Sequence, residues 1–238
     1  NVNFSYYRER LLKRDKNYTW KSPIHEVIEP IGNLYYSDIC ITHKKEKHDT
    51  YSTRNLQIFE NMIKNSIPLD ARQQYYYSRE LMYHSKFKKA IKNFNIFLEN
   101  KDGWIENKIN ACLDLASCYK SLNNEKMYLS SLFRSFEYDV PRAEICTNLG
   151  IYFMTKNNYN LAIYWLEKAT KIQPKIENGG FVLLDYYTYL PYINLCVCYD
   201  KLGNSRLAYE YNEKAGEIKP TSLEYLQNKK YFENLKIN

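Results

Sequence analysis

The feature that most constrains the fold is the spacing of small, large and helix-ending residues between Arg142 and Pro174. Gly150 and Ala162 are small, and their positions would let two successive helices cross at close range. Pro174 would end the second helix, because proline cannot continue the helical hydrogen-bond pattern. The stretch therefore predicts a pair of antiparallel helices. The residues that make the pattern are Leu149-Gly150, Phe153, Ala162, Leu166, Ala169 and Pro174.

This pattern resembles the tetratricopeptide repeat (TPR), which recurs with a period of about 34 residues. Similar spacings begin at Ala71, Ile109 and Tyr189, and an insertion over 175–188 separates the third unit from the fourth. A last amphipathic stretch, 222–235, would cover the end of the stack, as terminal repeats need. We therefore predict an all-α fold, a TPR superhelix of about four helix pairs plus a capping helix, with a small β/loop segment at the N-terminus.

The N-terminal part differs from the repeats. Short β-prone runs occur at 4–7, 18–20, 25–28 and 38–43, with Pro and Gly residues between them. The pattern becomes helical from about residue 50 and stops before Pro68. We therefore divide the chain into strands and loops at 1–48, a linker helix at 49–70 and a TPR domain at 71–238.

Composition restricts the class of protein further. The net charge is +7, with ten Lys or Arg against seven Asp or Glu in residues 1–55 and 24 against 20 in the rest. This excess is diffuse, whereas nucleic-acid binders concentrate it on one face, so we expect no nucleic-acid partner. No apolar run approaches the ~20 residues of a membrane span. The six cysteines lack a zinc-ligand spacing, and we expect no metal site in this chain, reduced thiols and a cytoplasmic protein.

A TPR array offers a peptide-binding groove on the inner face of its first helices. The offsets place an Arg/Tyr group of the first repeat there, and Tyr and Arg dominate interface energetics. The alternative is that Tyr75 or Tyr76 packs in the core. Asn148 and Asn194 could hydrogen-bond an extended peptide, or they could be solvated helix positions. The predicted groove residues are Arg72, Tyr75, Tyr76, Arg79, Tyr83, Asn110, Asp114, Asn148, Ile151 and Asn194.

One further constellation lies before the repeats, where His25 and Glu26 are adjacent and follow Trp20. Such a pair can ligate a metal or move a proton, but a lone His-Glu is more often structural. The surrounding residues are a closer guide. In order, they are Trp20, His25-Glu26, Gly32, Ser37-Asp-Ile39-Cys-Ile41-Thr-His43, Tyr51 and Arg54-Asn55, then Pro68, Asp70, Tyr75-Tyr76, Glu80-Leu81 and Pro191 to Gly203.

This succession resembles the C-terminal part of bacterial family 2 glycosyltransferases that carry TPR repeats. One departure is Ser22, where many members have Gly. The resemblance implies an enzyme that uses a divalent metal, Mg or Mn, to transfer sugar from a nucleotide-sugar to an acceptor. It also implies that the repeats hold either a peptide or protein acceptor or a partner subunit. It places His25 near the donor diphosphate or metal, and Glu26 and Trp20 near the acceptor pocket.

The sequence lacks the Asp-x-Asp that holds the metal in that family. We therefore expect no cofactor in this chain and no catalysis by it alone. Because the sequence begins with Asn1 rather than Met, we expect a piece of a longer protein. The alternative is a stand-alone TPR adaptor for protein–protein interaction with no enzymatic activity. A TPR regulator would need a DNA-binding head that the sequence lacks. Exposed strand edges near the N-terminus would also allow a homodimer.

Overall fold

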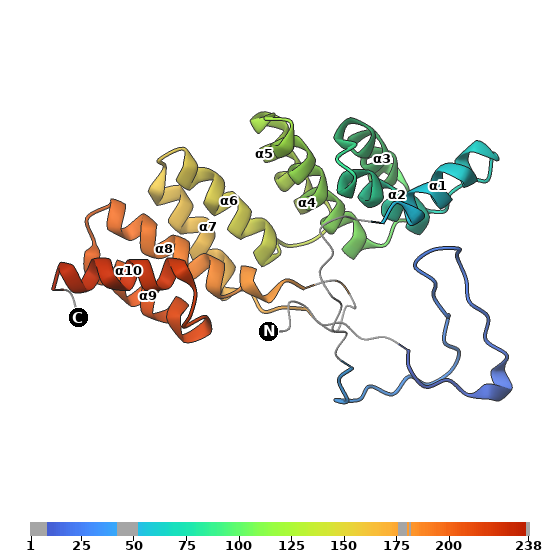
Figure 1. Ribbon diagram of the computed structural model, residues 1–238, viewed down its shortest axis with the longest axis horizontal. Helices are drawn as coiled ribbons and strands as arrows, with labels where there is room; N and C mark the ends of the chain where they lie inside the picture. Colours follow the sequence, from blue (N-terminus) through green and yellow to red (C-terminus); the bar gives the residue numbers. More distant parts are fainter. Residues whose placement is uncertain (1–8, 42–51, 176–179, 181, 237–238) are drawn as a thin grey trace. The chain divides into compact units, whose positions relative to one another are not determined.

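The computed structural model describes residues 9–41, 52–175, 180 and 182–236, and their regular structure is helical (Figure 1). The predicted all-α class is confirmed. The helices are α1 (Arg54–Lys64), α2 (Ala71–Tyr83), α3 (Phe87–Glu99), α4 (Ile105–Ser121), α5 (Glu125–Arg134), α6 (Ala143–Thr155), α7 (Tyr159–Lys171), α8 (Tyr189–Lys201), α9 (Ser205–Ile218) and α10 (Leu223–Asn234), with 3₁₀ turns η1 (Arg14–Lys16), η2 (Ser135–Glu137) and η4 (Leu184–Tyr186).

The predicted N-terminal strands are wrong where the structure describes them. Within residues 9–41 the strand-like pairing is one isolated antiparallel bridge between Lys21 and Val27. The runs at 18–20, 25–28 and 38–41 form no strand, and the run at 4–7 lies outside the described residues. The physical reason is that β-prone residues need partner strands, and a single hairpin is marginal in water.

The close helix crossing predicted at Gly150 is present. A Cβ added at Gly150 on α6 would lie 2.5 Å from Leu166 Cγ on α7 and 3.2 Å from the carbonyl oxygen of Ala162. Ala162, Leu166 and Leu149 have no exposed surface. The spacing of small and large residues therefore places these two helices as the sequence predicts.

The turn inside each helix pair repeats a single backbone feature. One residue has a positive φ in each of the four turns: Ser85 (57°), Asn123 (55°), Asn157 (57°) and Gly203 (79°). Gly and Asn tolerate this left-handed conformation better than other residues. The following Asn158 and Asn204 cap α7 and α9 by accepting from the amides of Leu161 and Leu207. The repeat is thus visible in the turns as well as in the cores.

The chain divides into two compact units, with the main boundary between Tyr128 and Leu129 inside α5. Three of the helix pairs have a fully buried alanine at the equivalent position of the repeat, namely Ala90, Ala162 and Ala208. The second pair has Tyr128 at that position, and the division between the two units falls at this residue.

The C-terminal unit ends as predicted, with α10 packed on α9. Ser222 caps α10 by accepting from the amide of Tyr225, and Phe232 is 1% exposed. A Cβ added at Gly216 on α9 would overlap the Tyr225 ring. Pro191 lies in the first turn of α8, where proline is tolerated.

All six cysteines are free thiols, and those other than Cys40 are buried. Burial raises the pKa of Cys118, Cys146, Cys196 and Cys198 to about 12. These side chains therefore act as small hydrophobic groups. Within the described part of the chain, no helix is long and apolar enough to cross a membrane.

Candidate protein-binding face of the first helix pair

The five groove residues predicted on α2 share one face of that helix, since they follow one another at intervals of one, three and four residues. The structure gives them different roles. Tyr75 is fully buried and lies against Phe97, with ring centroids 5.2 Å apart. This burial favours the core alternative for Tyr75, and its role in the groove stays a prediction.

Arg79 and Tyr83 form a cluster with Asp114 of α4. Arg79 Nε lies 3.3 Å from Asp114 Oδ2, and the guanidinium carbon lies 5.6 Å and 5.3 Å from the ring centroids of Tyr75 and Tyr83. Burial raises the pKa of the Asp114 carboxyl to about 6, although Arg79 and Tyr75 act to lower it. The ion pair thus fixes the position of α4 against α2, and Arg79 is partly a structural residue.

Arg72 and Tyr76 are covered by the chain itself. A turn over residues 21–28, which we call the N-terminal turn, lies on this end of α2. Arg72 Nη1 donates to the carbonyl oxygen of His25 at 2.6 Å. The imidazole of His25 stacks on Tyr76, with centroids 3.9 Å apart and planes 19° apart. No local sequence pattern predicts this contact, because the two segments are far apart along the chain.

Glu80, also on α2, lies close to side chains of α1, of the N-terminal turn and of the residue that follows α2. Asn55 Nδ2 on α1 donates to Glu80 Oε1 at 3.1 Å, His25 Nε2 lies 3.9 Å from Oε1, and His84 Nε2 lies 4.0 Å from Oε2. Burial acts to raise the pKa of Glu80, but the nearby His25 and Asn55 outweigh it and lower the pKa. Within the described residues, no group of three or more His, Cys, Asp or Glu has the geometry to hold a metal ion.

Two of the groove residues predicted in the C-terminal unit donate to backbone carbonyls of their own helices. Asn148 Nδ2 donates to the carbonyl oxygen of Glu144 at 2.8 Å, and Asn194 Nδ2 donates to that of Leu190 at 2.7 Å. Ile151 is half-buried, as is Asn110 in the other unit. These contacts favour the structural reading of the two asparagines, although a role for them in binding stays a prediction.

Glu144 of α6 hydrogen-bonds to the insertion at 175–188, and the sequence did not predict this contact. It is 6% exposed, and its carboxylate accepts from the amide of Leu183 at 3.0 Å and from the Tyr187 hydroxyl at 3.0 Å. Burial raises its pKa despite these bonds. An acidic residue at a groove offset in the repeat that precedes an insertion is the signal that could have predicted this contact.

The residues placed near a catalytic centre by resemblance differ in their surroundings. His25 packs on α2, whereas Trp20 is 66% exposed and Glu26 is exposed. Their catalytic roles, the nucleotide-sugar and the divalent metal therefore stay predictions.

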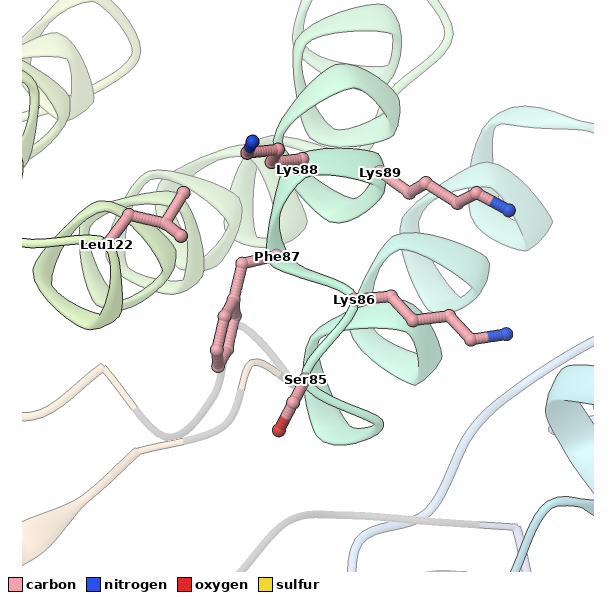
Figure 2. Close-up of a pocket in the computed structure, with 6 residues that line it drawn as sticks. All are labelled: Ser85, Lys86, Phe87, Lys88, Lys89 and Leu122. Atoms are coloured by element: carbon pink, nitrogen blue, oxygen red, sulfur yellow. The ribbon is translucent and has the colours of Figure 1, made fainter.

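Figure 2 shows an open depression beside the turn between α2 and α3, with Phe87 and Leu122 among its lining residues. The side chain of Lys88 points away from those of Lys86 and Lys89, which extend to the other side of the view, and Lys86 pairs with Glu60 at 3.3 Å. The lysines therefore do not form a shared site for an anion.

Comparison with known proteins agrees with the geometry of the helix pairs. The model of the tetratricopeptide repeat matches residues 143–176, the stretch that contains the Gly150 crossing. The chain has a TPR fold. A search among curated proteins finds no match.

Solved structures with similar folds include three TPR-like chains. The MamA protein has a TM-score of 0.51 at 17% identity, covering 68% of this chain and 79% of that one. TTC0263, a TPR protein of Thermus thermophilus, has 0.50 at 18%, covering 74% and 87%. PilW, a type IV pilus biogenesis factor, has 0.52 at 16%, covering 73% and 79%. At these identities the likeness concerns the fold alone, and these comparisons give no support to the glycosyltransferase resemblance.

Proposed function

We propose that this TPR chain is a protein-interaction module that holds a peptide segment of its partner on the exposed part of the α2–α4 face. The observation that carries the proposal is the cluster of Arg79, Tyr83 and Asp114. The ion pair and the ring contacts fix the Tyr83 side chain beside a charged pair that is still partly exposed. Preorganised aromatic and Arg groups of this kind contribute most of the energy in protein interfaces.

The test is a selection of random 12-residue peptides against the full chain, followed by affinity measurement. We expect selected peptides to bind at least about tenfold more weakly to Tyr83→Ala, a loss typical of an interface anchor. Lys92→Ala is the control, because Lys92 is an exposed residue of α3. Equal affinity for the two variants, or the absence of any selected peptide, would contradict the proposal.

A second candidate function is the C-terminal region of a glycosyltransferase. One observation favours it: His25, Tyr76 and Glu80, three of the residues that carry the resemblance, come together in the structure. Asn55, a fourth, also contacts Glu80. In such an enzyme these contacts would join the catalytic domain to the repeats, and the exposed Trp20 and Glu26 would face the acceptor.

This candidate is tested by reading the coding frame upstream of Asn1. An upstream domain with an Asp-x-Asp would support it, and Glu26→Gln should then lower sugar transfer from a nucleotide-sugar in the longer protein. A start codon close to Asn1 would rule it out and leave the interaction module.

A further inference from the structure

The N-terminal turn contacts α2 as a bound peptide would. Ile24 is 4% exposed and Ile28 is 9% exposed. Other large apolar side chains of the same segment are open to solvent, including Leu11 at 97% and Ile39 at 85%. Burial is therefore confined to the part of the segment that lies on the helix, which indicates a specific contact and not a general collapse.

The polar contacts are as specific as the apolar ones. Arg72 donates to a backbone carbonyl, that of His25, and Gln73 Nε2 donates to Ser22 Oγ at 3.3 Å. The imidazole of His25 stacks on the Tyr76 ring, and its Nε2 lies 3.9 Å from Glu80 Oε1. The face thus contacts the backbone, a hydroxyl and an imidazole of the turn, whose two aliphatic side chains, Ile24 and Ile28, are buried.

The backbone of the turn is held in a conformation that it would not prefer when free. Ser22 has φ 76° and His25 has φ 54°, and neither is glycine. Such residues cost free energy and persist where surrounding contacts determine the conformation. The amide of Val27 donates to the carbonyl of Lys21 at 3.1 Å, and the reverse bond is 2.9 Å, so the turn is closed as it docks.

We propose that the face formed by Arg72, Gln73, Tyr76 and Glu80 is a recognition site for a peptide turn of the type Ile-His-x-x-Ile, and that residues 24–28 fill this site in cis. The site takes a polypeptide with an aliphatic residue, a histidine and a second aliphatic residue at this spacing. The proposal does not depend on the function proposed above, because the occupant belongs to the chain itself. The proposed recognition site also does not include Tyr83, the residue on which the function proposed above is tested.

The test uses a fluorescein-labelled synthetic peptide of residues 18–31 as the probe. The double variant Ile24→Ser/Ile28→Ser in the full chain removes the apolar contacts of the resident turn. We expect this variant to bind the peptide at least about tenfold more tightly than the wild type, whose site is filled and whose apparent affinity is reduced by the occupied fraction. Adding Tyr76→Ala to the double variant should abolish the gain.

Ile31→Ser/Ile39→Ser is the matched control, because it makes the same chemical change at two exposed positions of the same segment. It should bind the peptide no better than the wild type does. Equal peptide binding by both double variants, or an opened variant that keeps its helical circular dichroism and binds no peptide, would overturn the proposal.

A second measurement keeps the test valid if the opened variant does not fold. Hydrogen exchange at the Val27 amide in the wild type should be slow, and Tyr76→Ala should speed it at least about tenfold. Fast exchange in the wild type, or slow exchange that Tyr76→Ala leaves unchanged, would show that the turn does not dock on α2.

Discussion

The α6–α7 pair and the face of α2 show two ways in which this repeat fold is stabilised. Between α6 and α7, small residues let the backbones approach, and Leu166 fills the space beside Gly150. On α2, ion pairs, ring contacts and a distant segment replace this simple packing, and Arg72 reaches a residue 47 positions earlier. Local spacing therefore builds the helix pair, whereas the chemistry of a helix face can depend on any part of the chain.

The largest expected effect concerns the closely packed α6–α7 pair. Gly150→Leu should lower the free energy of unfolding by about 3 kcal/mol, because overpacking a filled crossing forces the backbone apart. Urea unfolding followed by circular dichroism would measure it. Asn160→Leu, at an exposed position of α7, is the control and should change little. A Gly150→Leu variant as stable as the wild type would show that the crossing is not tightly packed.

The next effect concerns the ion pair between α2 and α4. Arg79→Ala should cost about 2 kcal/mol at pH 8, since it leaves the largely buried carboxylate of Asp114 without its cation. The double change Arg79→Met/Asp114→Leu should recover more than half of that loss, because no charge is then left unpaired. If the double variant is no more stable than Arg79→Ala, the ion pair is not the cause of the loss.

The pH dependence of this pair has a defined sign. The pKa of Asp114 is about 6 in the folded chain and near its ordinary value of about 3.9 when unfolded. Between these two pH values the folded state binds more protons at Asp114 than the unfolded state does. The protonated carboxyl therefore contributes stability that is fully present below pH ~4 and is lost as the pH rises through about 6. The free energy of unfolding of the wild type, minus that of Asp114→Asn, should therefore fall as the pH rises from about 4 to about 6. A difference that is constant from pH 4 to 7 would contradict the raised pKa.

A smaller effect is expected in the N-terminal turn, where it tests whether the backbone is strained. Ser22→Gly should slow hydrogen exchange at the Val27 amide by an amount equivalent to about 0.5 kcal/mol, because glycine adopts the positive φ of Ser22 without strain. Ser22→Ala is the control, since it also removes the hydroxyl that Gln73 contacts but keeps the Cβ. Exchange that is no slower in the Gly variant than in the Ala variant would show that the backbone is not strained there.

The smallest effect is expected in the C-terminal unit. Asn194→Ala should change the free energy of unfolding by less than about 0.5 kcal/mol, because the lost bond is a donation to a carbonyl of its own helix. Thermal unfolding would measure it. A larger loss would show that the asparagine stabilises more than α8, and a loss of peptide binding at unchanged stability would restore its predicted role in the groove.

Much of the fold was determined by the sequence itself. Helix pairs, their crossings and the capping helix depend on contacts between residues close together in the chain, such as Gly150 with Leu166 or Gly216 with Tyr225. Spacing alone encodes such contacts. The predicted strands failed because β-propensity describes a fit to neighbouring strands, and the described residues around Tyr18 and His25 have none.

The tertiary structure decided which residues of the candidate face are available. By spacing, Tyr75, Tyr76, Arg79 and Tyr83 were equivalent, yet the first is core, the second lies under His25 and the third pairs with Asp114. The sequence placed these residues on one face but could not show what else lies there. That depends on contacts between segments far apart along the chain, and no local pattern records them.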